Sequence, residues 1–404
     1  MKYAIVIPDG CADEPQDSLG GRTPLQAAKL PNMDRAARMG LVGRADNVPK
    51  PLTPASDVAT LSLFGYDPLV VYTGRAPLET VAMGLKLGAA DWAVRCNLVT
   101  VRDGRMHDFT AGHINNADGA QLMAAVHERL GGTIDGGRLE FHAGVQYRNV
   151  MIYRAEGKPA PFGSETKTQP PHDIPDKPVA DYVPKGPGSD LLNDLMNRSQ
   201  PIFADHPVNE ERALRGERPA TQIWLWGQGR APSVPSFARE YGPRGAIVSA
   251  VDLVRGTGML IGWHRVDAPG ATGYLDTDYA SKGRTGIEAL REHDLVCVHV
   301  EAPDEASHEG RADEKVKALE RIDEHIVGPL LEALPKHGEW RILISPDHRT
   351  TLRTRAHAYG AVPFAVAGTG IPSKGQTSYD EVVAGASDVV FDPGWKLMRW
   401  FLGR

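Results

Sequence analysis

Short apolar runs alternate with amphipathic stretches along most of this chain. Residues 3–8, 294–300 and 341–347 each contain an apolar run of the length expected for one buried β-strand. Between the last two runs, residues 314–334 have the apolar spacing of a long helix. Strands that alternate with helices indicate an α/β domain built on a mostly parallel sheet.

The pattern changes between about residues 90 and 180, where we expect a smaller α+β unit. Meandering strands joined by tight turns replace the alternation of strands and helices. A stretch rich in proline, glycine and lysine, residues 158–188, is expected to be the exit linker of this unit. The predicted elements are a hairpin at 96–102 and 106–110 around Asp103-Gly104, an amphipathic helix at 119–132, and a strand, turn and strand within 138–154.

The alternation of strands and helices then returns. Residues 191–203 are predicted to be helical, residues 222–227 to form a strand, and residues 245–258 to form a strand followed by a turn. We therefore expect a discontinuous main domain, residues 1–80 plus 185–404, and an inserted domain, residues 81–184.

Aspartate and histidine residues follow the predicted strands of the main domain. Because strand ends in an open α/β sheet meet at one crevice, we expect these side chains to converge. Three carboxylates and three imidazoles are suitable ligands for two divalent cations. Any one pair of Asp and His residues could equally well lie in a helix cap or a polar loop. Such positions would not explain why the whole set occurs at successive strand ends. The set is Asp9, Asp304, His308, Asp347, His348 and His357.

Ser56 is the candidate nucleophile. It is expected at or next to the N-terminus of a short helix within residues 51–67. A hydroxyl there gains from the helix dipole and from free backbone N–H groups, which also bind phosphate. Coordination to a cation would lower the pKa of the hydroxyl and activate it. Taken alone, however, this segment favours an ordinary N-cap serine.

The inserted unit and the segment before it supply candidate substrate-binding groups. Arginine suits the recognition of phosphate and carboxylate, although each arginine taken alone also fits a solvated surface charge. Asp108 and His113 could act as acid or base on a substrate hydroxyl. His172 and Asp173, in the exit linker, could either close over a ligand or belong to a proline-stiffened turn. The full set of candidates is Arg75, Arg95, Asn97, Asp108, His113 and Arg148.

Composition and charge narrow the class of protein. A formal net charge of -6 over 404 residues argues against a general nucleic-acid-binding surface. Cys11, Cys96 and Cys297 are too few and too scattered for a disulfide framework or a thiolate zinc site, which favours a reducing compartment. With no apolar run of about 18 residues and no signal-peptide pattern, we expect a cytoplasmic protein that does not associate with membranes.

At this point the motifs resemble a known family, the archaeal-type cofactor-independent phosphoglycerate mutases of the alkaline phosphatase superfamily. The resemblance covers essentially the whole chain. It is carried by IVIPDG, TPLQAA, PASDVATLSLFGYDP, YTGRAPLE, RCNLVTV, AGHI, PPHDI, VSAVDLVRG, GATGYLDTDY, VHVEAPDEASH and SPDH, of which VHVEAPDEASH is the most specific. It implies a three-layer α/β/α core, similar to that of alkaline phosphatase, with a smaller inserted α+β cap domain.

The resemblance also implies roles for matching residues. Asp304, His308 and His357 would bind one cation. The other would be bound by Asp9, Ser56, Asp347 and His348. The cations would be manganese, with magnesium, zinc or cobalt as alternatives, and 2,3-bisphosphoglycerate would not be required.

The reaction implied is the interconversion of 3-phosphoglycerate and 2-phosphoglycerate in glycolysis and gluconeogenesis. Ser56 would carry the phosphoryl group as a metal-bound phosphoserine while glycerate re-orients. The cap residues Arg95, Asn97, His113 and Arg148 would hold and protonate the glycerate. Arg255, where the family usually has a lysine, would contact the phosphate. The protein would act on this small phosphorylated substrate as a monomer or small homo-oligomer.

This sequence departs from the family pattern near the nucleophile and near the last metal ligands. Ala55 precedes Ser56 where glycine is usual, and Thr60 replaces an asparagine. Arg349 and Thr350 follow His348 where Ser-Thr or Pro-Thr is common. These changes leave the metal ligands intact and alter their surroundings.

Three alternative functions stay open at the level of sequence. A homoserine kinase-like phosphotransferase would keep the metal centre and change the acceptor, although the chain has no Gly-rich Walker loop for ATP. A metal-dependent phosphatase would pass the phosphoryl group to water. A binding protein without catalysis would be expected to have lost Ser56 or a metal ligand, and neither is lost.

Overall fold

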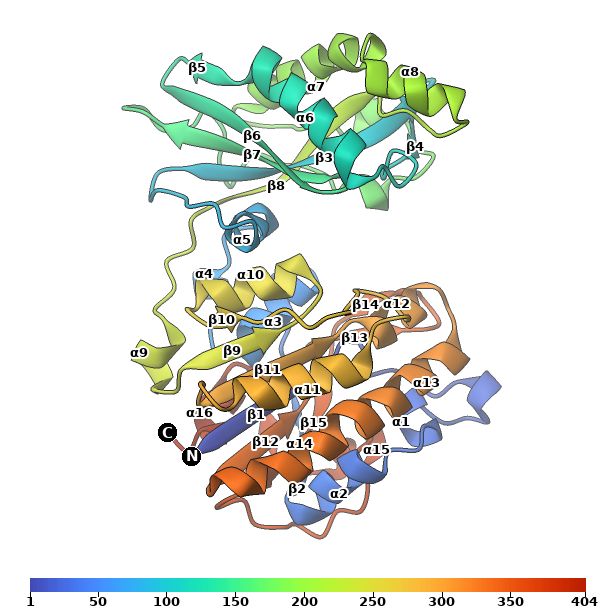
Figure 1. Ribbon diagram of the computed structural model, residues 1–404, viewed down its shortest axis with the longest axis vertical. Coiled ribbons are helices and arrows are strands. Elements are labelled where there is room, and N and C mark those ends of the chain that lie inside the picture. The colour runs from blue at the N-terminus through green and yellow to red at the C-terminus, as the bar shows by residue number, and fades with distance from the viewer. The chain divides into compact units, whose positions relative to one another are not determined.

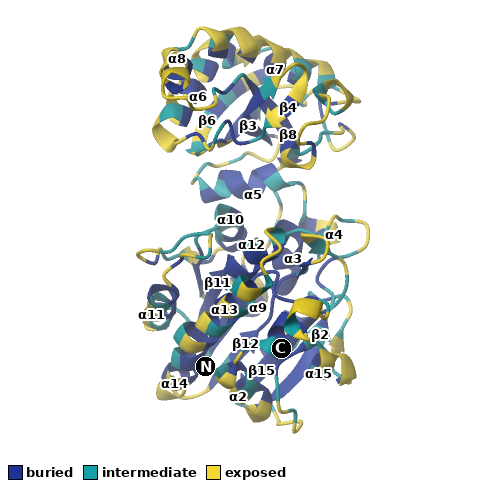
Figure 2. Cartoon of the chain, turned by 90° about the vertical axis from the view of Figure 1, so that its right-hand side faces the viewer, coloured by how far each residue is buried: buried dark blue, intermediate teal, exposed yellow.

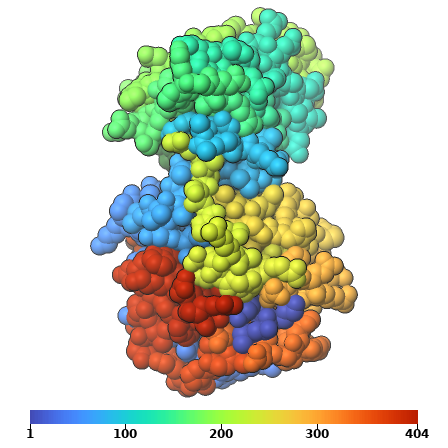
Figure 3. Space-filling view, turned by 90° about the vertical axis from the view of Figure 1, so that its left-hand side faces the viewer, coloured from blue at the N-terminus to red at the C-terminus, as the bar shows by residue number.

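The computed structural model describes residues 1–404 and divides into two compact units. Unit 1 consists of Met1–Tyr72 and Val234–Arg404, and unit 2 consists of Thr73–Ser233. In Figure 3 the blue residues of the N-terminal segment lie among the orange and red residues of the C-terminal half. Both ends of the chain therefore build unit 1.

An eight-stranded sheet forms the centre of unit 1 (Figure 1). β1 pairs in parallel with β11 on one side and with β12 on the other. β15 pairs with β12 and β2 in the antiparallel sense. The strands in sheet order are β10 (His264–Arg265), β9 (Gly245–Val248), β11 (Leu295–Val300), β1 (Lys2–Pro8), β12 (Trp340–Ile344), β15 (Val362–Gly368), β2 (Leu41–Ala45) and β16 (Val390–Phe391).

Helices cover both faces of this sheet. Alternate residues of β1 show the division, because Ala4 and Val6 belong to one apolar cluster and Ile5 and Ile7 to the other. Figure 2 shows the central strands of the unit coloured as buried. The predicted three-layer α/β/α core is thus confirmed. One face carries α1 (Pro24–Ala27), α2 (Pro31–Met39), α11 (Tyr279–Ala289), α13 (Ala312–Ile322), α14 (Gly328–Ala333) and α15 (Glu381–Ala386), and the other carries α3 (Ser56–Leu63), α4 (Pro68–Val71), α9 (Phe237–Tyr241), α10 (Asp252–Leu260) and α16 (Lys396–Phe401).

Unit 2 is an α+β unit. Its hairpin β3–β4 turns at Asp103 and Gly104, which both have positive φ (50° and 70°), as a tight two-residue turn requires. One face of its sheet packs on α6 and α7, and the other face is partly covered by α5. Its elements are α5 (Arg75–Ala82), β3 (Trp92–Arg102), β4 (Arg105–Asp108), α6 (Asn116–Leu130), β5 (Gly132–Ile134), β6 (Gly137–Val145), β7 (Arg148–Ala155), α7 (Ser189–Ala204), α8 (Pro207–Leu214) and β8 (Gln222–Arg230).

The boundaries of the inserted domain differ from the predicted 81–184. Residues 185–233, assigned to the main domain from the sequence, belong to unit 2 because β8 pairs with β3. Trp224 and Leu225 of β8 lie in the apolar core of that unit. Residues 73–80 also belong to unit 2, since Ala76 packs against Ala93 and Val150. The apolar pattern of a strand identifies the strand but not the sheet that it joins.

The turn predicted after β9 is also wrong, because the chain forms α10 there. Gly256 and Gly258 lie within this helix, and a Cβ at Gly258 would lie 2.9 Å from the Ile247 side chain. The glycine therefore allows close packing of the helix on the sheet. No helix of the chain is both long enough and apolar enough to cross a lipid bilayer.

Candidate active site

The seven predicted cation ligands lie together in unit 1. Asp9 directly follows β1, and Asp304 and His308 lie on α12 (Ala302–His308), which follows β11. Asp347 and His348 follow β12, and His357 lies on β14 (Ala356–Ala358), which pairs with β13 (Arg349–Thr351). Since β11, β1 and β12 are parallel neighbours, their carboxyl ends reach the same edge of the sheet. Ser56 is the first residue of α3.

Asp304, His308 and His357 form a first ligand group. His308 Nε2 lies 3.0 Å from Asp304 Oδ2 and 3.1 Å from His357 Nε2, and His357 Nε2 lies 3.6 Å from Asp304 Oδ1. The Nδ1 atoms of the two rings face backbone carbonyls, those of Arg355 and Pro54. A carbonyl can only accept a hydrogen bond, so each ring in its neutral form carries its proton on Nδ1 and can direct an Nε2 lone pair towards a bound cation.

Asp9, Asp347, His348 and Ser56 form a second ligand group. His348 Nε2 lies 3.4 Å from Asp9 Oδ1, 3.4 Å from Asp347 Oδ2 and 3.1 Å from Ser56 Oγ. Asp9, Asp347 and His348 are at most 1% exposed, and Ser56 is 8% exposed. The proposed nucleophile therefore lies directly beside the side chains that the family resemblance grouped with it.

Both groups fit divalent cations. Two donor atoms that are each about 2.1 Å from a shared cation lie roughly 3.0–3.4 Å apart, close to the spacings found here. Asp9 Oδ1 and Asp347 Oδ2 are buried without a hydrogen-bond partner, which is costly unless a cation or another donor compensates them. Burial, with the nearby carboxylates of Asp347, Glu301 and Asp304, raises the pKa of Asp9 well above its ordinary value. Such a concentration of acidic groups is stable when it binds positive charge.

We predict that the ion-free protein loses stability as the pH rises from about 6.5 to about 8. Burial raises the pKa of Glu301 to about 7 and that of Asp9 well above its ordinary value. Hydrogen bonding to Asp304 outweighs burial and raises the pKa of His308 to about 9. A group whose pKa is higher in the folded than in the unfolded state stabilises the fold fully at pH values below its unfolded-state pKa. This stabilisation is lost as the pH rises through the folded-state pKa.

Thermal unfolding of chelator-treated protein at fixed ionic strength measures this effect. The midpoint temperature of unfolding should fall between about pH 6.5 and about pH 8. Mn²⁺ should reduce this fall, because the bound cation supplies the positive charge that the bound protons supplied. His299, whose pKa burial lowers to about 3, is neutral in both states above about pH 6.5 and does not oppose the trend. A midpoint of the ion-free protein that rises over this interval would contradict the prediction.

The sequence analysis missed His299 and Glu301. His299 Nε2 lies 2.7 Å from Asp9 Oδ2, and its Nδ1 lies 3.0 Å from Ser249 Oγ. This fully buried ring holds Asp9 so that Oδ1 faces His348. Glu301 approaches the same ring at 3.4 Å. The available signal was a histidine within the otherwise apolar run of β11.

The structure shows where the residues lie that the sequence analysis identified as departures from the family pattern. Ala55 is the N-cap of α3 and has no side chain that could cap the helix. Thr60, one turn after Ser56, is fully buried, and its Oγ1 has no hydrogen-bond partner. Arg255, in contrast, makes ion pairs with Asp252 at 3.3 Å and Asp267 at 3.1 Å.

In unit 2, three of the predicted substrate-binding residues, Arg75, Arg95 and Asn97, contact Trp226. The Arg95 guanidinium lies over the Trp226 ring at 4.4 Å and that of Arg75 at 5.9 Å, while Trp226 Nε1 donates to Asn97 Oδ1 at 3.1 Å. Arg148 on β7 lies directly opposite Asn97 on β3. Trp226 was not among the predicted residues, because its strand was assigned to the other domain.

This cluster has a net positive charge. Glu79 contacts Arg95 at 2.9 Å and Arg75 at 3.2 Å, so one carboxylate faces two guanidinium groups, and Arg148 adds a third positive charge that acts on Arg95. Burial, together with the charges of Arg75 and Arg148, lowers the pKa of Arg95 to about 10. Arg95 is buried, and an anionic ligand would offset the excess of positive charge around it.

Asp108 and His113 belong to one tightly hydrogen-bonded loop. Asp108 accepts hydrogen bonds from Thr110, Gly112 and Arg218, and these hold its pKa below the ordinary value although burial opposes them. This environment suits a carboxylate that supports the loop better than one that transfers protons. Ala111, Gly112 and His113 all have positive φ (50°, 68° and 50°), a strained backbone that such support maintains.

His172, in the exit linker, packs against aromatic rings of unit 2. Its ring lies 5.4 Å from Trp226 and 6.2 Å from Phe109 in edge-to-face contacts. Asp173 lies beside it in a short 3-10 turn. Of the two roles predicted for this segment, the turn is therefore present.

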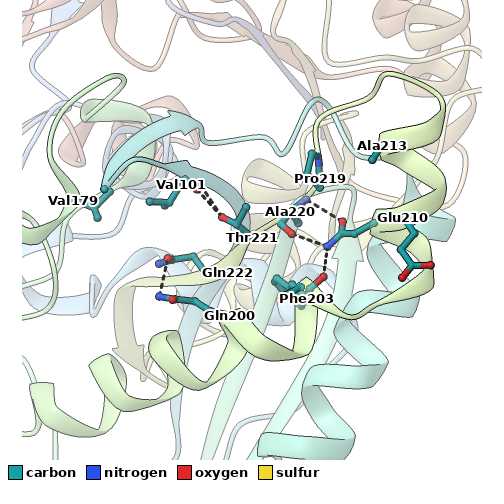
Figure 4. A pocket seen from close by; sticks show the side chains of 13 residues that line it. Val101, Val179, Gln200, Phe203, Glu210, Ala213, Pro219, Ala220, Thr221 and Gln222 are labelled. Carbon is teal, nitrogen blue, oxygen red and sulfur yellow. Dashed lines mark hydrogen bonds between the residues drawn. The ribbon is translucent and has the colours of Figure 1, made fainter.

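A cavity of about 700 Å³ in unit 2 (Figure 4) contains none of the predicted site residues. It is lined by residues of β3, α7, α8 and β8 and the neighbouring loops. Its polar groups pair with one another, as Gln200 does with Gln222 and Asn209 with Ala220. Such a cavity offers few groups to recognise a polar ligand.

Comparisons with known proteins agree with this description. A family model described as 2,3-bisphosphoglycerate-independent phosphoglycerate mutase matches residues 37–209. The chain is 47% identical over 400 residues to a 2,3-bisphosphoglycerate-independent phosphoglycerate mutase of Methanothrix thermoacetophila, covering 99% of each chain. It is 44% identical over 409 residues to a probable enzyme of the same name from Geobacter sulfurreducens, covering 100% of each chain.

Solved structures show the same fold. A protein from Pyrococcus horikoshii matches with a TM-score of 0.81 and 27% identity, over 100% of this chain and 97% of that one. A cofactor-independent phosphoglycerate mutase from Thermoplasma acidophilum matches with a TM-score of 0.67 and 24% identity, over 100% of each chain.

Proposed function

Because the chain belongs to the family of 2,3-bisphosphoglycerate-independent phosphoglycerate mutases, we propose that it interconverts 3-phosphoglycerate and 2-phosphoglycerate through a phosphoserine at Ser56. It is accordingly an isomerase that transfers a phosphoryl group within one substrate. The observation that carries the phosphoserine is the position of Ser56 Oγ, 3.1 Å from His348 Nε2 beside two buried carboxylates.

Two divalent cations, with Mn²⁺ preferred, complete the proposed site. One would be held by Asp304, His308 and His357, and the other by the second ligand group, Asp9, Ser56, Asp347 and His348. When bound, they would lower the pKa of the Ser56 hydroxyl and neutralise charge on the phosphoryl oxygens.

Ser56 would attack phosphorus from the N-terminus of α3, where the helix dipole favours the negative charge of the phosphoryl group. In the first step the Ser56 hydroxyl gives up its proton and its Oγ forms a bond to phosphorus, the bond from phosphorus to O3 of the glycerate breaks, and O3 takes up a proton. The glycerate then turns, its O2 hydroxyl gives up a proton and attacks phosphorus, the Oγ–P bond breaks, and Ser56 takes up a proton again. No water enters the balance, so the reaction is an isomerisation.

The arginine cluster of unit 2 supports a role in binding the anionic groups of the substrate. Arg95 is fixed by Glu79 and Trp226, and a preorganised guanidinium can bind carboxylate or phosphate through two hydrogen bonds. We assign the retention of glycerate to Arg75, Arg95, Asn97 and Arg148, and the donation of its proton to His113. Asp108, which was also proposed as a catalytic group, would act by holding the loop of His113.

Phosphorus NMR with purified protein, Mn²⁺ and 3-phosphoglycerate tests this function. The expected result is conversion to an equilibrium mixture with 2-phosphoglycerate and no accumulation of inorganic phosphate. Inorganic phosphate as the main product would favour the phosphatase alternative. Turnover of homoserine plus ATP, without formation of 2-phosphoglycerate, would favour the kinase alternative and refute the mutase.

A further inference from the structure

One buried hydroxyl lies between the two ligand groups of unit 1. Thr350, on β13, is fully buried. Its Oγ1 lies 2.5 Å from Asp304 Oδ1 in the first ligand group and 3.1 Å from His348 Nδ1 in the second. Ligands of both proposed cations therefore contact the same oxygen atom.

The single proton of this hydroxyl sets the direction of both hydrogen bonds. A carboxylate can only accept, so Thr350 donates to Asp304. The hydroxyl oxygen must then accept a proton from His348, which places the imidazole proton on Nδ1. His348 Nε2 is left with its lone pair, directed at Ser56 Oγ and the carboxylates of Asp9 and Asp347. A metal-binding imidazole nitrogen requires that lone pair.

The surrounding chain leaves this hydroxyl little freedom. Lys315, fully buried, donates to the Thr350 carbonyl at 2.8 Å and to Asp13 Oδ2 at 2.8 Å. Gly10 (φ +57°) packs so closely that a Cβ there would lie 2.5 Å from Thr350 Oγ1 and 2.3 Å from Asp304 Oδ1. The hydroxyl is consequently held against both ligands.

We propose that Thr350 is a positioning residue that couples the two cation sites, by orienting Asp304 in one and fixing the tautomer of His348 in the other. The proposal rests on the two-cation site of the proposed function. It extends that site to a residue that binds neither cation nor substrate.

Binding of Mn²⁺ to ion-free protein, without substrate, tests the proposal. Free Mn²⁺ is measured by electron paramagnetic resonance during titration of the wild type, Thr350→Val, Thr350→Ser and Thr351→Val. Thr350→Val should weaken the affinity of both sites by about 10- to 100-fold, the usual effect of losing a hydrogen bond to a metal ligand. Thr350→Ser keeps the hydroxyl and should stay within about threefold of the wild type.

Thr351→Val is the matched control. It makes the same substitution one residue along the same buried strand, where the lost hydroxyl contacts Thr354 instead of a cation ligand. Its Mn²⁺ affinity should equal that of the wild type. Equal affinities for wild type and Thr350→Val, or equal losses in Thr350→Val and Thr351→Val, would overturn the proposal.

The tautomer of His348 provides a test that does not depend on a variant of Thr350. Two-bond ¹H–¹⁵N spectra of wild-type protein labelled at histidine, with His348 assigned by its substitution with glutamine, should show the Nδ1–H form. The Nε2–H form would overturn the proposal even if Thr350→Val fails to fold. Neither measurement includes phosphoglycerate. The two cation sites can therefore be shown to be coupled through Thr350 even in a protein that fails the mutase assay.

Discussion

Replacing Ser56 by alanine is expected to lower kcat for phosphoglycerate interconversion by about 10⁴-fold or more. The proposed reaction requires an oxygen that forms a covalent bond to phosphorus, and no other hydroxyl lies within hydrogen-bond distance of His348 Nε2. Removing it leaves only substrate binding and electrostatic effects. The measurement is the initial rate of 2-phosphoglycerate formation with saturating Mn²⁺.

Ser62→Ala is a suitable control because Ser62 is buried on the same helix. Its rate should stay within about threefold of the wild type, as expected for a small change away from the reacting atoms. Wild-type protein quenched with ³²P-labelled substrate should carry label on the peptide that contains Ser56. A Ser56→Ala variant with more than about a tenth of wild-type activity would exclude the phosphoserine.

Removal of bound divalent cations is expected to lower activity by roughly 10³-fold or more, because cations that stabilise a developing charge contribute several kcal/mol to catalysis. Added Mn²⁺ should restore the activity, since the ligands are held by the fold. The rings of His308 and His357 are anchored through Nδ1 to the carbonyls of Arg355 and Pro54. The measurement is activity after dialysis against chelator, with metal content determined by mass spectrometry.

Asp304→Asn extends this test to one site. The change removes the carboxylate charge that His308 and His357 share, so Mn²⁺ stoichiometry should fall from two towards one. Asp313→Asn is the matched control, because Asp313 is solvent-exposed on the neighbouring helix α13 and pairs only with Lys317. Full activity in protein shown to contain no cation would refute the two-cation proposal.

The sequence predicted most of the candidate cation site because its residues share one local signal. Each Asp or His follows an apolar run, and a parallel arrangement of those runs brings their ends together. His299 escaped this reasoning since it lies inside its run, where a buried histidine is also compatible with an ordinary core position. Thr350 was noted only as a departure from a motif.

The sequence alone determined the α/β core, the strands that deliver Asp9, Asp304 and Asp347, and the chemistry of the ligand set. These follow from the periodicity of apolar residues and from residue type, which are local properties of the chain. Only the tertiary structure decided that β8 joins β3, that Asp108 supports a loop, and that His299 and Thr350 orient the ligands. These features depend on contacts between residues that are far apart in the sequence, such as Asp9 and His299. No local sequence pattern specifies which partner a buried polar group will have.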